Sequence, residues 1–236
     1  MNNSNVSYKS HHYFIGKKLS KKDGLKIREI QQQIFHKNSY LDSKSKICNI
    51  YTPFLYLGYH NENIEDKLKS LLLPQFFAIS EKIKPFQCAL KSYIFAGQSK
   101  QFQYLALEYK TENDILNKAI IPFLKSYMDK YTGRDLSFET TPIIPLFRFD
   151  SNNMEKFLHK NQHAVINNKY VFMDIPMPSV SYNSSKKEKF IKIDSIELMR
   201  ATPINIRKGK KTFNEQLQID TLMSIPLQQP IGNDQG

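Results

Sequence analysis

Histidine is the side chain best suited to proton transfer near neutral pH, and this chain contains six histidines among 236 residues. Four of them form two close groups, His11 with His12 and His159 with His163. Such spacings can suit a metal ion, but no carboxylate or cysteine accompanies either group in a ligand pattern. We therefore predict neither a metal site nor a cofactor. His60 directly follows an apolar segment and could reach a cleft, although a solvated loop is the more ordinary interpretation.

Positive charge is the other chemical resource of the chain. Lys and Arg number 34 against 22 Asp and Glu, which gives a net charge of +12 and favours an anionic partner such as nucleic acid. A basic cluster near the C-terminus is the candidate nucleic-acid contact, and it consists of Arg207, Lys208, Lys210 and Lys211. An A/T-rich genome would also enrich Lys and Asn, so charge alone leaves the RNA partner open.

Two apolar segments resemble each other and indicate a duplicated unit. Residues 51–58 read YTPFLYLG, and residues 142–148 read PIIPLFR. Each segment follows a strand-then-helix pattern, and 38 residues separate Tyr13 from Tyr51 and also Leu105 from Ile143. Two equivalent strands related by a pseudo-twofold axis normally bring two matching residues into one cleft. We therefore expect strands 51–58 and 143–149 to lie side by side.

Hydrophobic periodicity places the elements around these segments. Strands are predicted over 13–19, 47–59, 85–95, 101–109, 143–149, 170–172 and 190–199. The first helix begins after Ser20 as N-cap, with Asp23 in its first turn, and runs to about residue 36. The other helices are predicted from 61 or 63 to a break at Pro74, from 111 or 113 to before Gly133 with a kink at Pro122, and over 154–159.

This order predicts an α+β fold of two pseudo-symmetric lobes, each an antiparallel or mixed sheet with helices outside. We expect a flexible tail over 1–11, a bilobal domain over 12–199 and an extension over 200–236 that lies outside the core. No apolar run approaches the roughly 20 residues of a membrane helix, and no leader-like stretch opens the chain. Cys48 and Cys88 are expected to be free buried thiols in a reducing intracellular compartment, either cytoplasm or an organelle matrix.

With these segments in this order, residues 12–199 resemble the 2H phosphoesterase family, which is also called LigT-like or 2′-5′ RNA ligase-like. Segment 51–58 is similar to the first family signature, His-x-Thr followed by an apolar run that ends in Phe-Leu-Gly. Segment 142–148 is similar to the second, Pro-His-x-Thr-Leu-x-Arg. The resemblance implies a cleft in which two His share acid–base work on a phosphodiester without a metal, while two hydroxyl residues hold the phosphate.

Both signatures depart from the family pattern at the residues that do the chemistry. The two signature His fall on Tyr51 and Ile143, and the two Thr fall on Pro53 and Pro145. Ile143 has no proton to exchange, and a tyrosine with its ordinary pKa of about 10 is a poor base. Proline offers a phosphate neither a hydroxyl nor a backbone N–H. No catalytic residue is therefore predicted, and the resemblance implies a degenerate member of the family that lacks both signature His.

Three functions stay open. The first is a non-catalytic binding or scaffolding protein, a basic subunit of an RNA-containing or other large and possibly organellar assembly, with protein partners on the segments 1–11 and 200–236. The second is an atypical phosphodiesterase acting on RNA or cyclic nucleotides. The third is a viral or pathogen protein that sequesters a nucleotide. Residues that could contact a ligand in the old cleft are Tyr51, Tyr56, His60 and Arg148.

Overall fold

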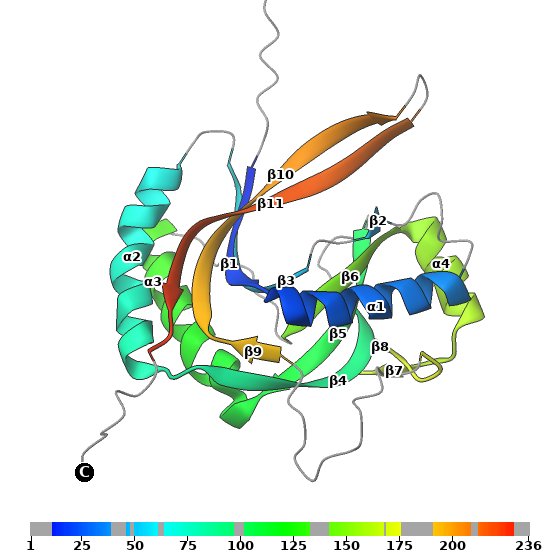
Figure 1. The fold of residues 1–236 in the computed structure, drawn as a ribbon, viewed down its shortest axis with the longest axis horizontal. Coiled ribbons are helices and arrows are strands. Elements are labelled where there is room, and N and C mark those ends of the chain that lie inside the picture. Colours follow the sequence, from blue (N-terminus) through cyan, green and yellow to red (C-terminus); the bar gives the residue numbers. More distant parts are fainter. Residues whose placement is uncertain are drawn as a thin grey trace, which may run out of the picture.

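The computed structural model describes residues 11–38, 46–47, 50–60, 64–96, 102–132, 142–167, 169–175, 191–208 and 212–228. Within them the chain forms the predicted α+β fold, with two antiparallel sheets and helices on their outer faces (Figure 1). The strands of the first sheet are, in order, β11 (Thr212–Pro226), β10 (Ser195–Lys208), β1 (His11–Lys18) and β3 (Tyr51–His60). The second sheet runs β2 (Lys46–Ile47), β6 (Ile143–Asp150), β5 (Phe102–Thr111), β4 (Phe86–Ala96), β8 (Lys169–Phe172) and β7 (His163–Ile166), with β9 (Ile191–Ile193) also paired to β4. The helices are α1 (Lys21–Lys37), α2 (Glu65–Lys82), α3 (Ile121–Thr132) and α4 (Ser151–Lys160), and α3 follows a short 3₁₀ turn, η2 (Glu112–Asp114), and a π-helical turn, η3 (Leu116–Ile120).

The two sheets contain the same local arrangement. One has the neighbours β10, β1 and β3, and the other has β4, β5 and β6. In each sheet the last two strands are joined by a helical connection, α1 in the first and η3 with α3 in the second. Tyr51 begins β3 opposite Lys18, and Ile143 begins β6 opposite Glu108. Tyr51 and Ile143 therefore hold equivalent positions in the two lobes.

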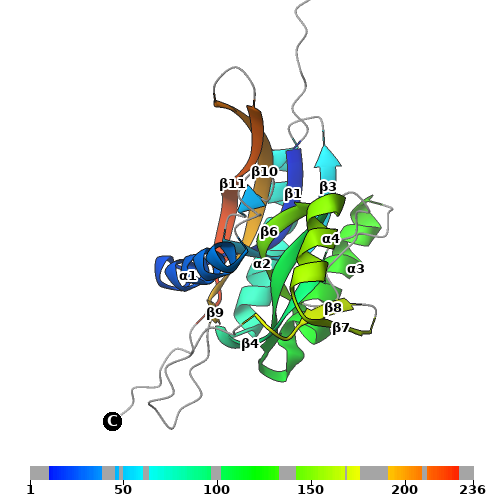
Figure 2. The same ribbon diagram turned by 90° about the vertical axis from the view of Figure 1, so that its right-hand side faces the viewer.

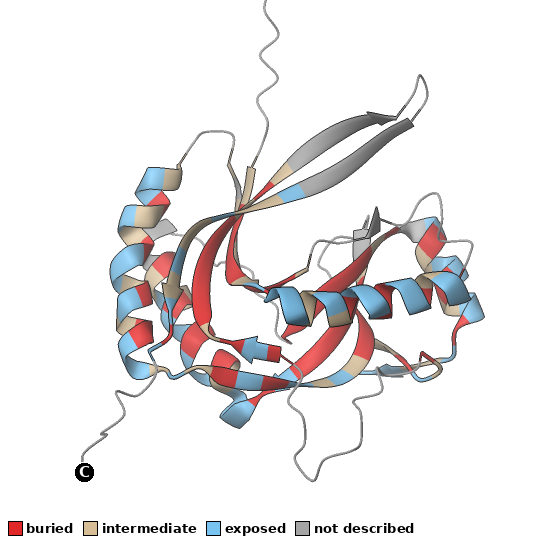
Figure 3. Ribbon diagram, viewed as in Figure 1, coloured by how far each residue is buried: buried red, intermediate tan, exposed pale blue. Residues whose placement is uncertain are grey.

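Each of these connecting helices packs on the sheet of the other lobe. Helix α1 joins β1 to β3 but contacts β6, and α3 joins β5 to β6 but contacts β3 (Figure 2). The contact is specific at Gln31, a fully buried side chain of α1 whose Nε2 donates to the carbonyl of Leu146 at 2.9 Å. Because each connecting helix packs on the sheet of the other lobe, the two lobes share one hydrophobic core. Figure 3 shows this core as the buried inner parts of the strands and helices.

Local signals that the sequence carries strongly are confirmed. Ser20 is the N-cap of α1, since its Oγ accepts from the backbone N–H of Asp23 at 3.1 Å. The predicted hairpin is formed by β4 and β5, and strands 51–60 and 143–150 do lie side by side, although in different sheets. No helix within the described ranges is long and apolar enough to cross a membrane.

Two predicted element bounds are wrong. Helix α2 does not break at Pro74, because the side chains of Leu68, Leu72, Phe76 and Ile79 are buried on both sides of it. Burying each such side chain is worth about 1.5–3 kcal/mol, and together they outweigh the roughly 3 kcal/mol that an interior proline costs. The predicted strand 47–59 is two strands, because β2 pairs with β6 of the other sheet. The helix around Pro122 is irregular, in keeping with the kink predicted there. The π-helical turn η3 ends at Ile120, two residues before this proline, and α3 continues from it.

The expectation that residues 201–236 lie outside the core is also wrong for β11. This strand pairs with β10 along its whole length and contacts α2. Leu222, Met223 and Ile225 pack against the main core, and Leu227 beyond the strand is buried. The basic residues 207–211 dominate the composition of this segment, whereas the apolar side chains that pack against the core are partly buried and lie in the second half of β11. Residues 1–10, the bulk of the expected tail, lie outside the described residues, and His11 already belongs to β1.

Candidate functional site

The two lobes meet where β3 passes β6, at Thr52. The Thr52 hydroxyl is fully buried, donates to the carbonyl oxygen of Ile143 at 2.9 Å and lies 2.5 Å from the hydroxyl of Tyr109. Burial raises the pKa of Tyr109 well above its usual value, so this phenol stays protonated. The hydrogen bond from Thr52 to Ile143 holds the first residues of β3 and β6 next to each other. Tyr51 and Ile143, the first residues of the two strands, lie at this contact.

Tyr51 belongs to a small apolar cluster on one face of the first sheet. Its ring lies 5.1 Å from that of Phe14, and Met199 and Ala201 complete the buried cluster. Tyr56 packs against the same cluster. The face therefore brings together two of the predicted ligand contacts, Tyr51 and Tyr56, on an aromatic and apolar surface.

Ile143 belongs to the matching cluster of the second sheet. It is 1% exposed and packs with Ile94 and Ala106. Pro145 is opposite Ala106 in the register, and Pro53 is opposite Gly16 on the other lobe. At Gly16 the strands approach so closely that a Cβ would lie 2.3 Å from the carbonyl oxygen of Thr52. All four positions singled out in the two signature-like segments, Tyr51, Pro53, Ile143 and Pro145, thus hold buried, packed side chains.

The other predicted ligand contacts do not join Tyr51. Tyr51 lies opposite Lys18 and His60 opposite His11, so seven residues of β1, about 23 Å, separate them. His60 packs edge-on against Tyr13 on the opposite face. Arg148 is partly buried in the second sheet opposite Tyr104, five residues along β6 from Ile143. Of the predicted nucleic-acid contacts, Arg207 and Lys208 fall at the end of β10, where their side chains lie outside the described residues, as do Lys210 and Lys211 altogether.

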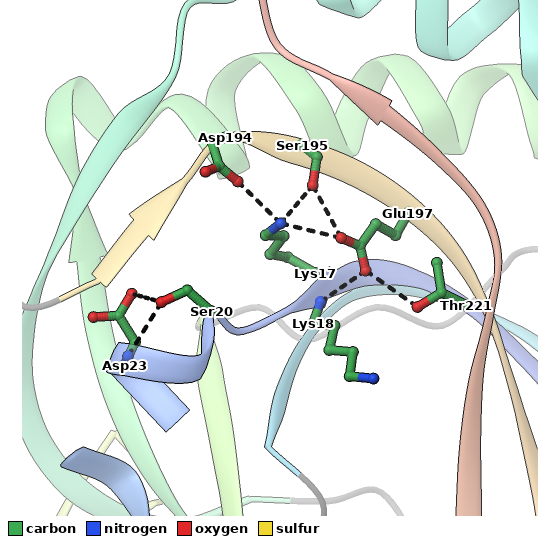
Figure 4. Close-up of polar contacts among 8 residues, drawn as sticks. All are labelled: Lys17, Lys18, Ser20, Asp23, Asp194, Ser195, Glu197 and Thr221. Atoms are coloured by element: carbon green, nitrogen blue, oxygen red, sulfur yellow. Dashed lines mark hydrogen bonds and ion pairs between the residues drawn. The ribbon is translucent and has the colours of Figure 1, made fainter. Parts of the chain in front are cut away.

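Sequence reasoning missed two carboxylates that lie beside the site. Glu108 is directly opposite Ile143, is 8% exposed and accepts from Lys91 Nζ at 3.0 Å and Ser92 Oγ at 2.6 Å. Glu197 lies on β10 opposite Gly16 of β1, and accepts from Lys17 Nζ at 3.1 Å and from the backbone N–H of Lys18 at 2.9 Å (Figure 4). Only strand register reveals them, since neither belongs to a sequence motif.

The Glu197 cluster is saturated with hydrogen bonds and holds its lysine charged. Ser195 Oγ donates to Glu197 and accepts from Lys17 at 2.6 Å, and Lys17 also pairs with Asp194 at 2.9 Å (Figure 4). Burial alone would lower the pKa of Lys17, but the hydrogen bonds and charges of Asp194 and Glu197 outweigh it and raise that pKa. Lys17 therefore stays protonated and cannot serve as the base that would activate Ser195 as a nucleophile.

His12 and His11 lie on opposite faces of β1. The His12 ring stacks on Tyr56 with a centroid distance of 5.4 Å, whereas His11 lies beside Tyr13 and its Nδ1 is 3.1 Å from Thr202 Oγ1. Burial, with a smaller contribution from the charge of His60, lowers the pKa of His12 to about 4. His12 is therefore neutral near pH 7 and part of the aromatic face. Within the described ranges no three His, Cys, Asp or Glu side chains are grouped as metal ligands.

We expect His12 to make the fold sensitive to acid. The unfolded chain takes up a proton near the ordinary histidine pKa of about 6.5, whereas the folded chain does so only near 4. The stabilisation that comes from this pKa difference is fully present above pH 6.5 and decreases as the pH falls towards 4. At pH 5 the free energy of unfolding is lower by about 2 kcal/mol for this reason. In urea unfolding, the His12→Gln variant should lose about 2 kcal/mol less than the parent when the pH falls from above 6.5 to 5. His36→Gln, which changes an exposed imidazole in the last turn of α1, is the matched control, and an equal effect of both variants would contradict the assignment.

Comparisons with known proteins give a likeness of fold. No family model and no curated protein matches the chain. Among solved structures it is similar to E. coli LigT in apo form, with 16% identity, a TM-score of 0.46 and coverage of 94% of this chain and 99% of that one. It is similar also to TT0787 of Thermus thermophilus, with 13% identity, a TM-score of 0.49 and coverage of 92% and 97%. LigT complexed with 3′-AMP gives 13% identity, a TM-score of 0.49 and coverage of 94% and 100%. At these values the likeness says nothing of the site, whose chemistry depends on this chain's own side chains.

Proposed function

We propose that this chain is a non-catalytic protein of 2H phosphoesterase-like architecture that serves as a binding or scaffolding subunit. The observation that supports the proposal is the pair of equivalent positions beside the Thr52 contact. They hold Tyr51 and Ile143, each packed in an apolar cluster. Acid–base catalysis of phosphodiester cleavage needs groups that exchange protons near the working pH, and neither residue is such a group.

The surrounding polar groups support the same conclusion. Glu108, the carboxylate nearest Ile143 in the register, is occupied by Lys91 and Ser92. Thr52, the hydroxyl closest to the degenerate positions, is occupied by Tyr109 and the Ile143 carbonyl. Groups committed to internal hydrogen bonds are poorly placed to bind a phosphate or to move a proton. An atypical phosphodiesterase would need to break these bonds first.

We expect no turnover of 2′,3′-cyclic nucleotides or 2′-5′ linked oligonucleotides above the rate in buffer. Each missing general acid or base typically lowers the rate about 10²–10⁴-fold, and here both are missing. The measurement is product formation by chromatography with purified protein in the presence of EDTA. Turnover that disappears in the Glu108→Gln or His60→Ala variant would overturn the proposal and support the atypical phosphodiesterase.

RNA or another polyanion is the partner class that the charge favours. The net charge of +12 would draw a phosphate backbone to the surface, and the basic residues 207–211 join two strands that pair with each other. Protein partners on the N-terminal and C-terminal segments are the alternative within the same proposal. In that case binding depends on apolar side chains and changes little with salt.

A salt titration of RNA affinity separates these partner classes. If the basic cluster binds phosphates, replacing Arg207, Lys208, Lys210 and Lys211 by Gln should reduce the slope of log Kd against log salt by up to about four, roughly one for each phosphate that is no longer neutralised. The matched control replaces four exposed lysines elsewhere, namely Lys21, Lys22, Lys82 and Lys84. Equal slopes for both variants would show that the cluster has no special part, and absence of RNA binding at low salt would leave the protein-scaffold form of the proposal.

A further inference from the structure

A polar cavity of about 360 Å³ opens in the second lobe, beyond the start of β6. It lies at the point where β5 ends and the chain turns into α3. Its polar lining includes Lys91, Glu108, Lys110, Thr111, Asp114 and Asn117. None of the predicted ligand contacts Tyr51, Tyr56, His60 and Arg148 lines it. A volume of this size lies within the range of small-molecule sites.

The charges in the cavity divide into an internal pair and two groups without an ion pair. Lys91 and Glu108 neutralise each other. Lys110 and Asp114 form no ion pair with any other residue in the described part of the chain. The cavity therefore presents one cation and one anion to a ligand, and its net charge is near zero. Such a dipolar site discriminates against simple anions and simple cations alike.

Two buried oxygen atoms of the lining also have no hydrogen-bond partner among the described residues. They are Thr111 Oγ1, in a side chain that is 9% exposed, and Asn117 Oδ1. Asn117 Nδ2 donates to Asp114 Oδ1 at 2.9 Å, which holds the amide oxygen beside the carboxylate. Acceptors are therefore concentrated at the Asp114 end, as a group with several N–H donors requires.

The backbone turns at this end through two consecutive residues in the left-handed region. Asn113 and Asp114 have φ angles of 51° and 55°. Asn and Asp enter this region more readily than other residues with a Cβ, so their types suit the turn. The turn is followed by Asn117, whose Nδ2 donates to the Asp114 carboxylate.

We propose that this cavity binds a small zwitterion, a free amino acid or a close relative. Its ammonium group donates to Asp114 and Asn117 Oδ1, its carboxylate pairs with Lys110, and Thr111 bonds to either group. The charges of Lys110 and Asp114 determine this class of ligand. The proposal does not depend on whether the protein has lost phosphoesterase chemistry.

The experiment measures binding of each standard amino acid to the full chain by saturation-transfer NMR at about 1 mM, followed by calorimetry of the tightest. Two derivatives of that amino acid then test the dipole: the N-acetyl form lacks the ammonium charge, and the carboxamide lacks the carboxylate. We expect Lys110→Met to weaken the amino acid and its N-acetyl form about fivefold, and Asp114→Asn to weaken the amino acid and its carboxamide by a similar factor. Asn tolerates the left-handed conformation, so the second variant keeps the backbone of the turn.

Lys118→Met is the matched control, because Lys118 is an exposed lysine of η3 outside the lining. It should alter no affinity. The proposal is overturned if no amino acid binds at about 10 mM, which would leave a cavity filled by water alone. It is overturned equally if the two variants weaken the two derivatives without distinction, or if Lys118→Met weakens binding as much as Lys110→Met.

Discussion

A chain that ends at Lys208, and so lacks β11, should fail to fold. The deletion removes the strand that covers one side of β10, together with the buried side chain of Leu227. It also removes three tethers, which are the hydrogen bond from Ser80 Oγ to the carbonyl of Pro226, the one from the backbone N–H of Leu227 to Asp194, and the ion pair of Asp220 with Arg200. Losses of this kind sum to more than the roughly 5–15 kcal/mol of a typical domain's stability.

Circular dichroism and urea unfolding of the two truncated chains provide the measurement. The control chain ends at Gln228 and keeps β11, Leu227 and all three tethers, so we expect it to unfold with nearly the parental midpoint. A cooperative transition in the chain that ends at Lys208 would mean that β11 is an accessory strand, as the composition of the C-terminal segment first suggested.

Gly16→Ala should destabilise the protein by more than about 3 kcal/mol. The new Cβ would stand 2.3 Å from the carbonyl oxygen of Thr52 and 3.1 Å from Pro53 Cα, and both are backbone atoms that cannot move alone. Strands β1 and β3 would have to separate. Because the Thr52 side chain ties β3 to Tyr109 and Ile143, the displacement would reach the contact between the lobes.

Gly24→Ala is the matched control for this prediction. Gly24 lies inside α1, and a Cβ there would meet only the Ile50 Cδ1 at 3.9 Å. Alanine is favoured over glycine inside a helix by about 0.5–1 kcal/mol, so the control should stabilise the protein slightly. We therefore expect the urea midpoint to fall for Gly16→Ala and to rise slightly for Gly24→Ala. A loss below about 1 kcal/mol for Gly16→Ala would show that β1 and β3 can shift apart freely.

The sequence predicted those parts of the fold whose signals are local. The cap at Ser20 and the hairpin of β4 and β5 depend on neighbouring residues, and both are confirmed. The path of β2 into the second sheet and the pairing of β11 depend on contacts far apart in the chain, and both were missed. Pro74 was misread for a related reason, since the tertiary burial that holds α2 together is invisible to a rule about proline.

The site divides in the same way. The equivalence of Tyr51 and Ile143 was predicted because a duplication leaves a repeated spacing, and the register confirms it. His60 was given as a residue that could reach the cleft because it follows the apolar segment, with a solvated loop as the more ordinary interpretation. Strand β3 places it about 23 Å from Tyr51, seven residues along the paired β1. Glu108 and Glu197 were missed. Strand pairing and bulges decide on which face of a sheet a carboxylate lies and which residues it contacts, and these cannot be predicted from one segment of sequence.

The position of β1 between β3 and β10 has a consequence for synthesis on the ribosome. β1 emerges well before β10, so its pairing with β10 waits for residues near 200. The exchanged helices add to the delay, since α1 has no sheet to cover until β6 has emerged. β1 can pair with β3 early, but its other edge and the inner face of α1 must wait for their native partners while most of the chain is made. Apolar side chains of both elements are exposed during that interval, and contacts of such large sequence separation form slowly. The nascent chain should depend on chaperones more than a protein of two sequential domains.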